Sequence, residues 1–246
     1  MLEFVVSSAV LVATSALILR MRSHRDNFSE EHLLKGYPSG TFYVREKYRG
    51  ILLLLVFAQI VPFWWVYTNC PPPMAKVASV YLFFLIPLVG VFYLEMMFPE
   101  QTRYTDIVGF GDERDYALQV LAGFIAGLAV VVAYAAVPYV RFQFLEISPM
   151  AVYFIVFAVP FTEEAVFGNF ITTSLLKNAG ILPALLLSGF LFGIFHYSVY
   201  MANAFYMFMA FAFRVLASLA LVKFGSFLPG LVGHAFVNTV SVLSGL

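Results

Sequence analysis

Long apolar stretches separated by short polar segments run through the whole chain. An α-helix needs about 20 apolar residues to cross the hydrocarbon core of a membrane. Eight stretches meet or approach this length, which predicts an all-α polytopic membrane protein with about eight transmembrane helices in one domain, residues 1–246. The expected spans are residues 4–19, 51–67, 77–98, 117–140, 151–176, 182–200, 202–222 and 227–243.

The composition favours the same class and excludes others. Hydrophobic residues make up 62% of the 246 residues and charged residues 11%, against about 45–50% and 25% in soluble domains. Lys and Arg number 14, as do Asp and Glu, so the formal net charge is zero. A nucleic-acid partner usually requires a basic face, so none is expected. Membrane lipid is the expected surrounding.

Lys and Arg concentrate in alternate loops, and cytoplasmic loops are enriched in these residues. With eight spans, eleven of them fall on one side, seven of these in the first loop, and only Lys76 and Arg141 fall on the other. A multi-pass integral membrane protein with both termini outside is therefore expected. Positive charge follows the first apolar segment instead of preceding it, which favours a retained helix over a cleaved signal peptide.

Five polar residues stand out because they lie inside expected spans of residues 151–246: Glu163, Glu164, His196, His234 and Asn238. Charged groups are costly in a bilayer, usually face the protein interior and mark function. Adjacent glutamates diverge by about 100° on a helix, so the two can meet different partners. A polar intramembrane site built from these residues is the expectation.

Chain spacing predicts that these residues meet. Glu164 and His196 lie 16 residues before and after Gly180, the expected centre of a helical hairpin turn, so they should lie at one depth, about 24 Å along the helix from the turn. His234 and Asn238 are four residues apart and share a helix face. Nearby residues are expected to open a pocket or allow close helix approach: Pro160, Gly168, Gly230 and Gly233.

Other unusual residues are expected to be structural. Glu95 and Arg214 are each alone in their spans, which favours an ion pair between helices or a side chain that reaches toward the interface. Cys70 is the only cysteine, so neither an internal disulfide nor a cysteine metal site can form.

The candidate site allows more than one chemistry. A carboxylate with an imidazole can activate water as a general base, while a second imidazole and an amide can stabilise an oxyanion. Glu163, His196 and His234 could instead hold one divalent metal such as zinc with an open position for water. The same groups could also simply hold helices together. The residues alone do not separate these alternatives.

Three short motifs resemble those of the CAAX prenyl protease and bacteriocin-processing family, also called the Abi family. That family has E-E-x-x-x-R on one helix, F-x-x-x-H on the next and H-x-x-x-N/D on a later one. Here residues 163–168 read E-E-A-V-F-G, residues 192–196 read F-G-I-F-H, and residues 234–238 read H-A-F-V-N. The resemblance covers residues 161–241, about a third of the chain.

The resemblance implies an intramembrane endopeptidase that hydrolyses a peptide bond. It assigns water activation to Glu163 and His196, and oxyanion stabilisation to His234 and Asn238. The family is commonly labelled metalloprotease, although a metal-free glutamate mechanism is also argued for it. Some members remove the last three residues of prenylated CAAX proteins, so a prenylated protein or peptide is one expected substrate.

One residue departs from the motif. Gly168 stands where the family has arginine, which would leave Glu164 a buried acid without its partner. We expect Arg214 to substitute from another helix, within about 6 Å of Glu164. Otherwise the chain would be a degenerate member with little activity.

Two other functions stay open at this point. A non-catalytic membrane binding or scaffold protein on the same fold is favoured by the missing arginine. A proton or ion transporter would use the acidic residues and histidines as relays. The loop charges also place the outside face nearer the site, whereas prenyl proteases receive their substrates from the cytosol.

Overall fold

The computed structural model describes residues 2–22, 69, 113–135, 152–197, 200 and 203–244. The regular structure of these residues is entirely helical, in agreement with the expected fold class. The second and third expected spans lie outside the described residues, as do Glu95 and Cys70. The count of eight spans therefore stays a prediction.

Five α-helices correspond to the first, fourth, sixth, seventh and eighth expected spans. Three of the described helices are long and apolar enough to cross a membrane, and two apolar helices are shorter. The sixth span is the poorest match, because its helix ends at Phe195 and leaves His196 as the C-cap residue. The helices are α1 (Leu2–Arg20), α7 (Tyr116–Ala135), α11 (Ile181–Phe195), α12 (Ala204–Phe224) and α13 (Leu228–Ser244).

The fifth expected span is a broken helix. It consists of a π-helix η3 (Phe154–Ala158), a short α-helix α9 (Val159–Glu163), a second π-helix η4 (Glu164–Thr172) and α10 (Thr173–Ala179). Pro160 lies in the first turn of α9, where its missing N–H leaves a helical hydrogen bond unmade. The irregularity expected at Pro160 is present, and it takes the form of π-helices, which often occur at functional sites.

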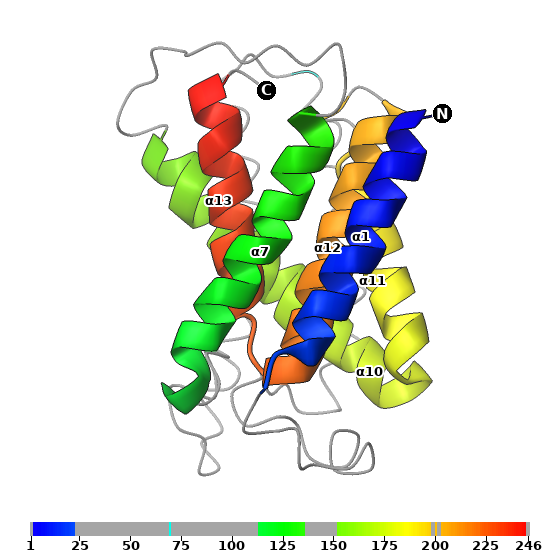
Figure 1. The fold of residues 1–246 in the computed structure, drawn as a ribbon, viewed down its shortest axis with the longest axis vertical. Coiled ribbons are helices and arrows are strands. Elements are labelled where there is room, and N and C mark those ends of the chain that lie inside the picture. Colours follow the sequence, from blue (N-terminus) through cyan, green and yellow to red (C-terminus); the bar gives the residue numbers. More distant parts are fainter. Residues whose placement is uncertain are drawn as a thin grey trace.

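Helix α12 forms the centre of the bundle, with α1, α7, α11 and α13 packed around it (Figure 1). Helices α10 and α11 meet at Gly180, whose positive φ of 83° suits glycine. This confirms the expected hairpin turn. Helix α12 ends at Gly225, a left-handed C-cap with φ of 65°.

Glycines bring α13 against its neighbours, as expected. A Cβ on Gly127 of α7 would lie 2.7 Å from the carbonyl oxygen of Gly233 on α13. A Cβ on Gly230 would overlap the Glu164 carboxylate. Small residues allow such close helix packing in membrane proteins, so these glycines fix the position of α13 next to Glu164 of η4.

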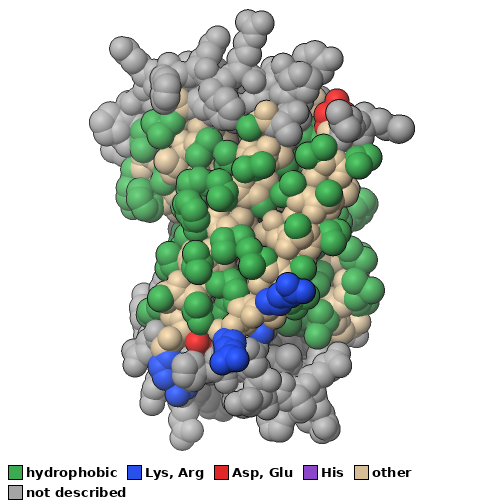
Figure 2. Space-filling view, viewed as in Figure 1, with side chains coloured by type: hydrophobic (Ala, Val, Ile, Leu, Met, Phe, Trp, Pro, Cys, Tyr) green, Lys and Arg blue, Asp and Glu red, His purple; other side chains and the backbone are tan. Residues whose placement is uncertain are grey.

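The two ends of the bundle differ in charge. At one end, Phe4 of α1 packs against Phe205 at the start of α12, with ring centroids 5.6 Å apart. At the other end, the described Lys and Arg side chains gather on the surface (Figure 2). They lie at the end of α1, before α7 and at the end of α12: Arg20, Arg22, Arg114 and Lys223. We call the two ends the Phe4 end and the basic end.

Candidate active site

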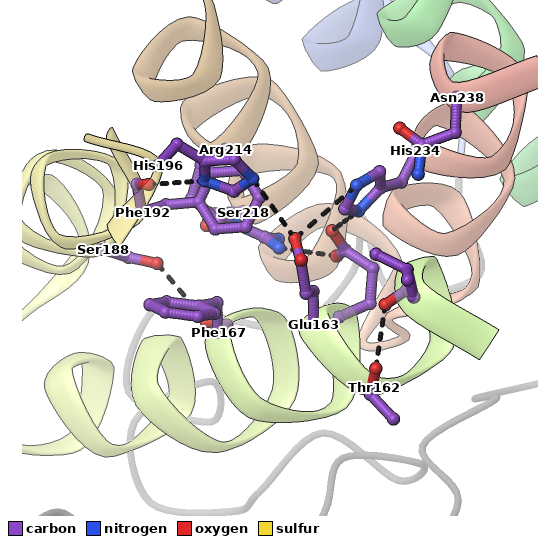
Figure 3. A network of polar contacts seen from close by, with 12 residues as sticks. Thr162, Glu163, Phe167, Ser188, Phe192, His196, Arg214, Ser218, His234 and Asn238 are labelled. Atoms are coloured by element: carbon purple, nitrogen blue, oxygen red, sulfur yellow. Dashed lines mark hydrogen bonds and ion pairs between the residues drawn. The ribbon is translucent and has the colours of Figure 1, made fainter. Parts of the chain in front are cut away.

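Two imidazole rings converge on one carboxylate oxygen. The Oε2 atom of Glu163, the last residue of α9, lies 3.5 Å from Nε2 of His196 and 3.7 Å from Nε2 of His234 (Figure 3). All three residues are buried, with exposed fractions of 5%, 8% and 5%. The hairpin spacing predicts that Glu164 meets His196, but in the structure its neighbour Glu163 is the glutamate that faces His196.

The contacts of the Nδ1 atoms indicate which nitrogen of each imidazole carries the proton. Nδ1 of His196 lies 2.9 Å from the carbonyl oxygen of Phe192, which can only accept, so Nδ1 carries the proton. Nδ1 of His234 lies 3.2 Å from Oε1 of Glu164. In the neutral rings both Nε2 atoms therefore present a lone pair toward Glu163. Oε2 of Glu163 is buried and has no hydrogen-bond partner.

The second carboxylate has a cation beside it. Glu164 is fully buried, and its Oε2 lies 2.5 Å from Nη1 of Arg214, which is also fully buried. The expected distance of less than about 6 Å is confirmed. Arg214 thus forms an ion pair between helices and does not reach toward the interface.

The side chain of Asn238 makes its hydrogen bond outside this cluster. Its Nδ2 donates a 2.8 Å hydrogen bond to the carbonyl oxygen of Ile155 in η3. It sits one turn beyond His234 on α13, as the shared face predicts. The structure therefore brings four of the five candidates into direct contact and leaves Asn238 at the edge, where it ties α13 to η3.

Residues 145–240 match the protein family described as type II CAAX prenyl endopeptidase Rce1-like. This part of the chain is thus similar to the CAAX prenyl protease and bacteriocin-processing family. The matched segment contains all five candidate residues and Arg214. No curated protein and no solved structure matches the chain. The match confirms the resemblance and supports, in general terms, an enzyme of a membrane-embedded protease family with a lipid environment and a peptide substrate.

The metalloprotease label of this family raises the question of a zinc ion. Catalytic zinc is usually held by three protein ligands and leaves one position for water. Within the described helices, no group of three or more His, Cys, Asp or Glu side chains is arranged to hold a metal ion. The side chains as placed do not fit such a centre, so no chemical step is assigned to a metal.

Sequence reasoning missed three buried hydroxyls near the Glu164–Arg214 pair. Oγ1 of Thr172 lies 2.7 Å from Oγ of Ser188 and 3.2 Å from Oγ of Ser218. A usable signal existed, because Thr172 and Ser188 lie eight residues before and after Gly180. The spacing rule that pairs the acidic residues with His196 would have paired these hydroxyls too. Ser218 follows Arg214 by four residues, one helical turn.

Proposed function

We propose that the chain is an intramembrane endopeptidase that hydrolyses a peptide bond with water activated by Glu163 and His196. One observation carries the proposal: a buried, unpartnered carboxylate oxygen faces two imidazole Nε2 atoms at 3.5 and 3.7 Å. These separations exceed ordinary direct hydrogen bonds. A bridging water is the usual explanation for polar groups at such distances.

In the first step, the carboxylate of Glu163 takes a proton from water while the water oxygen attacks the peptide carbonyl carbon. The lone pair on Nε2 of His196 accepts a hydrogen bond from the other O–H of this water and so orients the nucleophile. The Nδ1–H bond to the Phe192 carbonyl holds the His196 ring in the tautomer that this role needs. General-base catalysis of this kind accelerates a reaction by roughly 10²–10⁴-fold.

In the second step, negative charge develops on the carbonyl oxygen and must be stabilised. The proton that Glu163 takes from water can be shared with Nε2 of His234, 3.7 Å away, which then donates it in a hydrogen bond to this oxygen while Glu164 accepts the Nδ1–H. Asn238 has a second amide hydrogen besides the one given to Ile155, and we assign it the same role. The proton held by Glu163 then passes to the leaving nitrogen as the C–N bond breaks, so the carboxylate is restored.

We also propose that the substrate is a peptide segment presented at the membrane, with a prenylated CAAX-type C-terminus as the first to test. The support is the match of residues 145–240 to a prenyl endopeptidase family. The scaffold alternative rested on a buried Glu164 without a cation, and Arg214 removes that argument.

The test is cleavage of a prenylated CAAX-type peptide by purified protein in liposomes. Glu163→Gln keeps the side-chain shape and should reduce cleavage by roughly 100-fold or more. Ser15→Ala on α1 is the matched control, because Ser15 only bonds the Leu11 carbonyl of its own helix. Equal cleavage by the wild-type protein and Glu163→Gln, or none of prenylated and unprenylated peptides alike, would contradict the proposal.

A further inference from the structure

Arg214 is a fully buried cation near the middle of the apolar helix α12. We propose that Arg214 is a positioning residue, which fixes Glu164 and through it His234, and that its guanidinium takes the space that a side chain at residue 168 would fill. The proposal deepens the proposed function, because it concerns the same site.

The guanidinium is held from two sides. Nη1 contacts Oε2 of Glu164 at 2.5 Å, and Nε donates to Oγ of Ser218 at 3.1 Å. A planar guanidinium bonded through two of its nitrogens cannot rotate without losing one of these contacts. Arg214 is therefore fixed in orientation as well as in position.

The three buried hydroxyls complete this anchor, and their donors can be assigned in one consistent direction. Thr172 donates to the Phe167 carbonyl at 2.7 Å, so its oxygen is left to accept. Ser218 can then donate to Thr172 at 3.2 Å, and Ser188 can share its hydrogen between Thr172 at 2.7 Å and the Phe167 carbonyl at 3.3 Å. The Ser218 oxygen accepts from Arg214. These hydrogen bonds link α12 to η4, which begins with Glu164, and to α11, which is followed by His196.

The effect of Arg214 reaches the reacting groups through Glu164. A buried carboxylate without its cation is strongly disfavoured, so removal of Arg214 would turn Glu164 away or leave it protonated. Either change weakens the acceptor for Nδ1–H of His234, 3.2 Å away. The hydrogen bond at Nδ1 determines which ring nitrogen carries the proton, and therefore what Nε2 presents toward Glu163.

Arg214 occupies the space that a side chain on residue 168 would need. A Cβ on Gly168 would lie 2.9 Å from Oε2 of Glu164 and 3.2 Å from both Nη atoms of Arg214. A larger side chain at residue 168 could therefore enter only if the Glu164 carboxylate and the Arg214 guanidinium shifted. Removal of Arg214 would take away two of these three contacts and leave space through which a side chain from residue 168 could approach Glu164, four residues before it.

The experiment is an exchange of the arginine between the two positions. Thermal unfolding in detergent is measured for Gly168→Arg, Arg214→Ala, the double variant of both, and Arg214→Ala with Glu164→Gln. Each of the two single variants should unfold at a lower temperature than the wild-type protein. The exchange double variant should regain at least half of the loss, and so should the variant that removes both charges.

Two further measurements separate positioning from a purely structural role. In histidine ¹⁵N spectra, the Nδ1–H signature of His234 should be lost in Arg214→Ala and regained in the exchange variant. Cleavage should fall roughly 10–100-fold in Arg214→Ala, as for other supporting residues. It should return only in the exchange variant.

Unfolding and spectra do not depend on the reaction, so they decide the proposal even if no substrate is cleaved. An exchange variant no more stable than the worse single variant would overturn it. So would a His234 spectrum unchanged by Arg214→Ala. A protein that cleaves nothing but shows the expected exchange and spectra would instead count against the proposed function alone.

Discussion

Glu163 and Glu164 are neighbours in the chain but lie in different surroundings. Glu164 is paired with Arg214, whereas Glu163 faces the two imidazoles of His196 and His234. Because adjacent helical positions diverge by about 100°, one peptide segment can supply a charge-compensated anchor and a reactive carboxylate side by side. This division of roles gives the two residues different signatures in mutagenesis.

Glu164→Gln should lower the free energy of unfolding by about 3–5 kcal/mol, because it leaves the Arg214 guanidinium buried without its carboxylate. Glu163→Gln should cost clearly less, since that substitution breaks no pair with a permanent cation. Denaturant unfolding of both variants in the same detergent measures the difference. Equal losses would show that the two glutamates are held alike.

Most of the cluster could be predicted from the sequence, because charged residues in apolar spans have few stable places other than against each other. The distance of His196 from the Gly180 turn gave its depth, and Arg214 was the available cation for Glu164. The contact of Asn238 with Ile155 could not be predicted. It joins residues 83 positions apart and depends on the path of η3.

At the scale of the element, the broken helix between Phe154 and Ala179 departs most from expectation. The apolar pattern indicates a helix there but does not distinguish an α-helix from π-helices. In η4, the Thr172 hydroxyl bonds the carbonyl of Phe167, five residues earlier, at 2.7 Å. That bond and the contacts with the two serine hydroxyls stabilise the π-helical turn in the folded protein. The serines come from other helices, so local sequence alone cannot reveal the turn.

Thr172→Val tests this account, because valine has nearly the same shape and lacks the hydroxyl. The change removes one hydrogen-bond partner each from the buried Phe167 carbonyl, Ser188 and Ser218, so we expect a loss of about 1–3 kcal/mol in unfolding free energy. Thr239→Val on α13 is the matched control, since its hydroxyl bonds only the carbonyl of Ala235 within the same helix. If the two substitutions cost the same, the hydroxyl cluster contributes nothing special to η4.

At the scale of the whole molecule, the candidate site is closer to the Phe4 end than to the basic end. His196 stacks on Tyr200 with ring centroids 5.5 Å apart, and Tyr200 contacts Tyr206 near the start of α12. The Gly180 turn is about 24 Å of helix away from His196 in the opposite direction. The side of the membrane on which the basic end lies therefore decides from which side a substrate has the shorter path to the site.

The positive-inside tendency predicts that the basic end faces the cytoplasm. Cys70 is the only cysteine, so a Cys70→Ser background allows single-cysteine labelling with a membrane-impermeant maleimide. Glu3→Cys should react in intact cells, whereas Arg22→Cys should react only after permeabilisation. This result would place the nearer face of the site outside and favour substrates presented there over cytosolic prenylated proteins. The reverse labelling would contradict the predicted orientation and give cytosolic prenylated substrates the shorter path, because the Phe4 end would then face the cytosol.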